Sequence, residues 1–243
     1  PLFRSWSLYT FLKMNRLSFA EVISIRKTTQ KNLLLSVCAG LLVTALGLLW
    51  VRLCLKLDLF SGQANESGMD IYTTVFAAVF LAPVIEELLF RGVLWSILQE
   101  NKGTVTAVIV TTVYFVFLHL TLNNAFSAIL IGICGSMFIL FTGSIIPSIV
   151  IHLLNNLLVT ILGYSDIMHL PIEKLDSILT ISSLLIFLVI FAILLALVMF
   201  YGFFVNKEVV MKNVKTYQPI PKVIDRYSIA ILCFWMIYMI VVG

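Results

Sequence analysis

The sequence predicts an all-α membrane protein, a polytopic membrane helical bundle of about seven transmembrane helices with an additional N-terminal interfacial helix. Of 243 residues, 61% are hydrophobic and 12% are charged, and the mean hydropathy is +1.08, which is more apolar than a soluble domain of this length requires. The apolar runs are about 20 residues long and apolar on every face, whereas strands of a membrane barrel would be shorter and would alternate. Helices are therefore the expected membrane-crossing elements.

Seven apolar runs define the expected spans, and polar or charged loops with turn-forming pairs such as Ser61-Gly62 separate them. The first two spans are expected at residues 33–55 and 71–98. The others are expected at 104–120, 125–141, 145–162, 178–205 and 227–243. Since no internal repeat or second domain is visible, residues 1–243 are expected to form a single integral membrane domain. Within it, residues 71–163 are expected to form the functional core.

The charges are distributed unevenly along the chain. Residues 1–32 form a basic arm with interleaved aromatic residues, which indicates an amphipathic helix on an anionic membrane face and not a nucleic-acid-binding arm. With a cytoplasmic N-terminus, seven spans place this arm and the basic connector 206–226 inside and the acidic loops 56–70 and 164–177 outside, as the positive-inside rule requires. We expect an integral protein of a bacterial cell membrane whose direct surroundings are the lipid bilayer. The four cysteines lack C-x-x-C spacing and are interpreted as small membrane-embedded side chains.

Three ionisable residues interrupt the second span. Glu86, Glu87 and Arg91 would each cost several kcal/mol at membrane depth unless paired or facing a wet cavity, so they indicate a functional site. Glu87 and Arg91 are four residues apart in the order that pairs well on a helix. Glu86 lies about 100° around the helix from Glu87 and is therefore expected to face another partner.

Two histidines also fall within apolar spans. A single membrane histidine often only joins two helices by a hydrogen bond, but here Glu86 is on the second span, His119 is on the third, and His152 lies one helical turn before Asn156 on the fifth. Glu86 lies 17 residues before Gly103 and His119 lies 16 after it, so both are about 25 Å from the tip of the expected hairpin and can face one another. His152 lies only nine residues after Gly143, so it can reach the same depth only if the turn near Gly143 dips into the protein.

These residues occur in three patterns, E-E-x-x-x-R at 86–91, F-x-x-x-H at 115–119 and H-x-x-x-N at 152–156. All three are intact and in order, and they resemble the motifs of the CPBP intramembrane proteases, which include the type II CAAX prenyl endopeptidases and bacterial bacteriocin self-immunity (Abi) proteins. The resemblance covers about residues 71–163 and implies an endopeptidase. It also implies a membrane-associated peptide or lipidated peptide as substrate, of the CAAX type or of the bacteriocin or pheromone type.

The resemblance implies roles for the motif residues. Glu86 would be the general base that activates a water, His119 would help to hold that water, and His152 with Asn156 would stabilise the oxyanion. Glu87 and Arg91 would be a supporting pair, and Phe115 would pack beside the site. In a second version Glu86, His119 and His152 would hold a zinc ion, although no H-E-x-x-H pair is present and Asn156 is a poor zinc ligand.

Two non-enzymatic functions remain open from the sequence. The chain could be a membrane scaffold or bacteriocin self-immunity protein that binds a partner without turnover. It could also be a proton-coupled transporter with Glu86 and the histidines as a relay, but the repeat symmetry and matched broken helices of such transporters are not evident. Nothing in the sequence indicates the oligomeric state.

Overall fold

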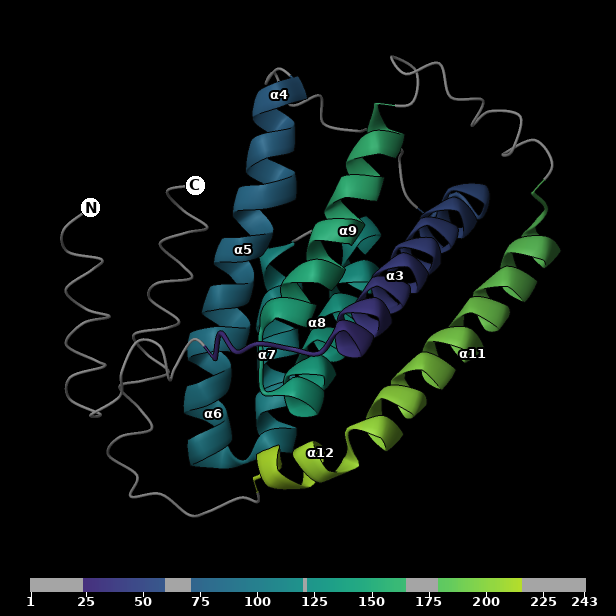
Figure 1. The fold of residues 1–243 in the computed structure, drawn as a ribbon. Helices are drawn as coiled ribbons and strands as arrows, with labels where there is room; N and C mark the ends of the chain where they lie inside the picture. The colour runs from purple at the N-terminus through teal and green to yellow at the C-terminus, as the bar shows by residue number, and fades with distance from the viewer. Residues whose placement is uncertain (1–23, 60–70, 120–121, 165–178, 216–243) are drawn as a thin grey trace.

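A computed structural model describes residues 24–59, 71–119, 122–164 and 179–215, and in these ranges every regular element is a helix (Figure 1). Four helices of this part are long and apolar enough to cross a membrane. They are α3 (Gln30–Lys56), α8 (Leu122–Thr142, of which 124–142 count toward the span), α9 (Ile146–Gly163) and α11 (Ile181–Val205). The prediction of a helical membrane bundle is confirmed.

The second predicted span is one continuous helical segment from Ile71 to Lys102 in which two π-helical stretches alternate with α-helix. Its parts are α4 (Ile71–Thr74), η1 (Val75–Leu81), α5 (Ala82–Glu87), η2 (Leu88–Leu94) and α6 (Trp95–Lys102). Pro83 lies in the first turn of α5, and its missing N–H removes a backbone hydrogen bond to the preceding turn. Single-turn π segments of this kind are frequent at functional sites.

The hairpin after this segment turns at Gly103, as the sequence predicts. Gly103 has φ +83°, a conformation that favours glycine, and its N–H donates to the Gln99 carbonyl at 3.1 Å. The following helix, α7 (Thr104–Leu118), has 15 residues and ends two residues earlier than expected. His119 is therefore the C-cap residue of α7 and does not lie inside a longer span.

The boundary of the N-terminal arm differs from the prediction. Residues 30–32 were expected in the arm, but they form the first turn of α3, because the Thr29 side chain caps the helix by accepting from the Asn32 N–H at 3.2 Å. Residues 24–29 contain no helix, and residues 1–23 lie outside the described residues, as does the predicted seventh span at 227–243. The two acidic loops fall largely outside them as well.

Helix α9 contacts four other elements of the described bundle, namely α3, α8, η1 and α5. Helix α8 also contacts α7 and α3. In Figure 1, α11 lies at one edge of the bundle and the α4 to α6 segment at the other. The buried core between them is made of large apolar side chains, among them Phe90, Phe115, Phe138, Phe141, Ile145 and Ile151.

The turn between α8 and α9 lies inside the protein, which brings His152 to the depth of Glu86. Ser144 and Ile145 are fully buried, and the Ser144 hydroxyl donates to the Arg26 carbonyl at 2.7 Å. The segment before α3 therefore covers one side of the turn. A short helix, α12 (Lys207–Asn213), covers another, since the Asn213 side chain donates to the Leu140 carbonyl at 3.0 Å. Part of the predicted basic connector is thus a helix that packs on α8.

Candidate active site

The Glu87 carboxylate is the centre of a buried polar cluster. It is fully buried, as is the Arg91 guanidinium, and Arg91 Nη1 donates to Glu87 Oε1 at 3.1 Å, so the structure forms the predicted pair. Two further donors come from α9. His152 Nδ1 lies 3.1 Å from the same Oε1, and the Ser148 hydroxyl donates to Oε2 at 2.5 Å. A carboxylate with three donors is one of the few ways to keep a charge inside a helical bundle.

The contact with Glu87 fixes the protonation pattern of His152. Glu87 accepts hydrogen bonds from Arg91 and Ser148 and therefore acts as a carboxylate acceptor toward His152 as well. Nδ1 of His152 is consequently the protonated nitrogen. This leaves the lone pair of Nε2 available, and Nε2 lies 3.8 Å from Glu86 Oε2. The ring is almost completely buried.

His119 is oriented in the same way by a different acceptor. Its Nδ1 lies 2.9 Å from the Phe115 carbonyl oxygen, which can only accept, so Nδ1 carries the proton. The lone pair of Nε2 then faces Glu86, with 4.0 Å between Nε2 and Oε2. Glu86 and His119 therefore face one another, as the residue counts on either side of Gly103 predict. His119 does so from the C-cap position of α7.

Phe115 packs against Arg91, His119 and His152. Its buried ring lies 4.2 Å from the Arg91 guanidinium carbon, and its centroid is 4.7 Å from that of His119 and 5.3 Å from that of His152. The ring therefore restricts both imidazoles and covers the cation on its π face.

Three acceptors converge on one point with no donor between them. Glu86 Oε2 and the two Nε2 atoms lie within 4.8 Å of one another. Glu86 Oε2 and His152 Nε2 are buried, and neither has a hydrogen-bond partner among the described residues. These acceptors can receive hydrogen bonds from water or hold a cation. The residue types suit zinc, and the hydrogen bonds of both Nδ1 atoms are those that orient zinc-bound histidines.

Asn156 lies on the same face of α9 but makes other contacts. Its amide nitrogen donates to the Ala78 carbonyl of η1 at 2.8 Å, and its oxygen accepts from Asn155 at 3.2 Å. Asn156 thus joins α9 to the π-helical stretch, and the Ala78 carbonyl obtains a partner outside its own helix. The predicted oxyanion role of Asn156 would require its amide to leave this bond.

Glu86 and His119 are partly exposed, whereas His152 is buried. The side chains of Glu86 and His119 are each 25% exposed, against 1% for His152. Ile85 and Phe117, which lie one and two residues from Glu86 and His119 in sequence, are 45% and 62% exposed. In a membrane-spanning bundle, exposed apolar side chains of this kind would contact lipid.

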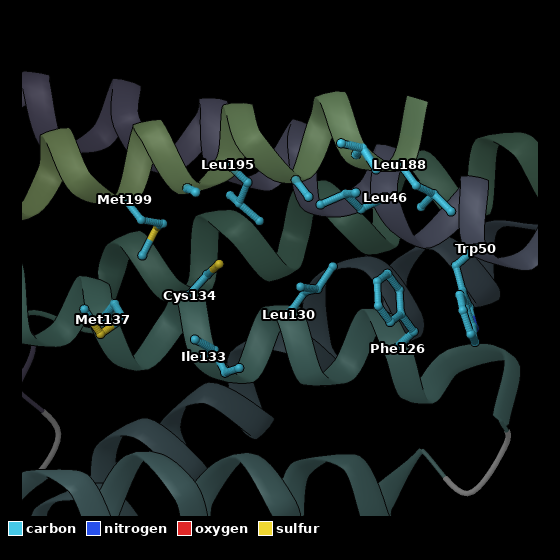
Figure 2. Close-up of a pocket in the computed structure, with 13 residues that line it drawn as sticks. Leu46, Trp50, Phe126, Leu130, Ile133, Cys134, Met137, Leu188, Leu195 and Met199 are labelled. Carbon is cyan, nitrogen blue, oxygen red and sulfur yellow. The ribbon is translucent and has the colours of Figure 1, made fainter. Parts of the chain in front are cut away.

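A separate apolar cavity of about 630 Å³ lies between α3, α8 and α11 (Figure 2). Its lining includes Trp50, Phe126, Met137 and Met199 and none of the polar residues described above. Cys134 of α8 faces this cavity, while the next residue, Gly135, faces Ser148. Helix α8 therefore separates the cavity from the polar cluster.

Ser148 is the site residue that sequence reasoning missed. It lies four residues before His152 and eight before Asn156, so the three polar residues share one face of α9, and this spacing was the available signal.

Comparison with known proteins supports the interpretation of the three motifs. Residues 69–158 match the family described as type II CAAX prenyl endopeptidase Rce1-like. Searches of curated proteins and of solved structures found no significant match.

Proposed function

Since residues 69–158 match the type II CAAX prenyl endopeptidase Rce1-like family, we propose that the chain is an intramembrane protease of this kind and that Glu86 activates a water that cleaves a peptide bond of a membrane-associated substrate. The observation that carries the proposal is the convergence of Glu86, His119 and His152 above a buried, charge-compensated Glu87. The partial exposure of Glu86 and His119 on a helical bundle with exposed apolar side chains supports a substrate that arrives from the bilayer.

The proposed step is a general-base hydrolysis. Glu86 takes a proton from the water while His119 Nε2 accepts a hydrogen bond from its other O–H, and the water oxygen bonds to the carbonyl carbon. The proton on Glu86 then passes to the leaving amine as the C–N bond breaks. The products are a new carboxylate and a new amine, and no covalent enzyme intermediate is needed.

Stabilisation of the oxyanion requires a positive charge or a donor at His152. Because Nδ1–H of His152 is donated to Glu87, Nε2 can donate to an oxyanion only in the doubly protonated ring, which the Glu87 carboxylate would stabilise. Glu86, His119 and His152 could instead hold a zinc ion, which would polarise the carbonyl and activate the water. The two imidazole nitrogens and the Glu86 carboxylate would be the ligands of such an ion, and both Nε2 atoms lie within 4.0 Å of Glu86 Oε2.

The test uses purified protein in proteoliposomes with a fluorogenic peptide that ends in a CAAX sequence, in farnesylated and unmodified forms. We expect cleavage at one bond, identified by product mass, and its loss in His119→Ala. Preference for the farnesylated peptide would indicate a CAAX-type substrate. Activity that resists strong chelation would favour the metal-free version, and loss restored by zinc would favour the metal version. No cleavage of either peptide by a folded wild type, combined with a biological effect that survives His119→Ala, would instead indicate a non-catalytic scaffold.

A further inference from the structure

We infer that Ser148 is a positioning residue for the proposed reaction, acting on His152 through the Glu87 carboxylate. This inference deepens the proposed function and rests on it. Arg91 and His152 both bond Oε1 of Glu87, whereas Ser148 is the partner of Oε2 among the described residues. The terminal torsion of a glutamate is broad, so donors on one oxygen alone hold the carboxylate less tightly than donors on both. A donor on each oxygen fixes its plane.

The bond from Ser148 also sets the register between two helices. Ser148 and His152 are one turn apart on α9 and bind the two oxygens of one residue on α5. Glu87 adjoins Glu86 in sequence, so this two-point attachment determines where His152 Nε2 lies relative to Glu86 Oε2, a separation of 3.8 Å. Loss of the hydroxyl would leave His152 bonded to a carboxylate that is held through Oε1 alone.

Helix α8 provides the space that the Ser148 hydroxyl occupies. A Cβ at Gly135 would overlap Ser148 Oγ and would lie 3.6 Å from Arg91 Nε. Glycine at this position therefore lets α8 approach α9 without displacing the hydroxyl. The same helix carries Gly132, where a Cβ would meet Thr112 Cγ2 at 2.7 Å, away from the Glu87 cluster.

The first test compares Ser148→Ala with Ser136→Ala. Both serines are fully buried, but the Ser136 hydroxyl has no hydrogen-bond partner in the described part of the chain. With the farnesylated peptide, we expect Ser148→Ala to lower kcat about 10-fold to 100-fold, as loss of a residue that orients a catalytic histidine does, with KM changed less than about twofold. Ser136→Ala should change kcat little. Ser148→Thr keeps the hydroxyl and should restore turnover, which a loss of packing alone would not explain.

A second pair of variants tests the contribution of α8. Gly135→Ala should lower kcat in the same way as Ser148→Ala, and adding it to Ser148→Ala should lower kcat little further, since the hydroxyl it displaces is then absent. Gly132→Ala creates a similar steric overlap outside the cluster and should affect thermal stability without a selective loss of kcat.

A spectroscopic measurement separates this inference from the proposed function. The chain has three histidines, so ¹⁵N NMR of histidine-labelled protein can follow His152 after assignment by His152→Ala. We expect the Nδ1–H form of His152 in the wild type and a mixture with the Nε2–H form in Ser148→Ala. This readout needs no substrate, so it holds even if the wild type cleaves neither peptide. Unchanged ¹⁵N signals in Ser148→Ala would overturn the inference, and so would, in an active enzyme, a kcat equal to that of Ser136→Ala.

Discussion

At the scale of single residues, the Glu87 and Arg91 pair should be costly to break from one side. Both side chains are fully buried, so removing one partner leaves the other charged and unpaired, a loss of about 3 to 5 kcal/mol in the free energy of unfolding. We expect Glu87→Gln and Arg91→Met each to unfold at clearly lower SDS fraction in mixed micelles. The double variant should recover only part of the loss, because Ser148 and His152 still face position 87. A double variant no more stable than the weaker single one would show that the pair is not coupled.

The same residues show what the sequence could and could not predict. The pairing of Glu87 with Arg91 follows from a spacing of four within one helix, and the structure forms it. The bonds from His152 and Ser148 depend on which face of α9 meets α5, and that is set by packing between distant segments. No local pattern contains this information, so Glu87 was expected only to form a supporting pair of the site with Arg91.

At the scale of elements, the bond from Asn156 to the Ala78 carbonyl should stabilise the π-helical stretch η1. A proline N–H is absent at Pro83, five residues after Ala78, and the Asn156 side chain donates to the Ala78 carbonyl at 2.8 Å. We expect Asn156→Ala to increase hydrogen exchange at residues 75–81, measured by mass spectrometry in detergent, while Asn155→Ala leaves it closer to the wild type. If exchange in this stretch is unchanged but cleavage is lost, Asn156 acts on the substrate and not on η1.

Element boundaries were predictable where local chemistry sets them. Glycine at the α6 to α7 turn and polar residues between apolar runs gave the hairpin and the order of spans. The interruption of the segment 71–102 by π-helix, and the position of His119 just beyond α7, were not visible in hydropathy, because apolar periodicity does not distinguish α-helical from π-helical turns.

At the scale of the whole molecule, the structure places the start of α3, the end of α11 and the start of α7 at one end of the bundle, where the basic residues are also concentrated. Asn32 at the start of α3 and Asn206 after α11 form two reciprocal hydrogen bonds of 3.1 and 2.9 Å, and the Lys215 carbonyl accepts from the Thr104 N–H at 3.0 Å. Six of the sixteen Lys and Arg residues lie in 1–32 and five in 206–226, so this end is expected to face the cytoplasm.

Cysteine-accessibility labelling tests this topology. Single cysteines at Asp58, just after α3, and at Lys215 should be labelled from opposite sides of the membrane in a background without the native cysteines. Labelling of both from the same side would contradict the orientation.

The most direct measurement of the central claim is peptide cleavage by Glu86→Gln. The substitution keeps the shape of the side chain and removes the base, so the protein should insert and fold as the wild type does, yet its single-turnover cleavage rate should fall by at least about a hundredfold. Glu208→Gln, the same change at an exposed position of α12, is the matched control and should cleave normally. Cleavage by Glu86→Gln at the wild-type rate would contradict the assignment of Glu86 as the general base.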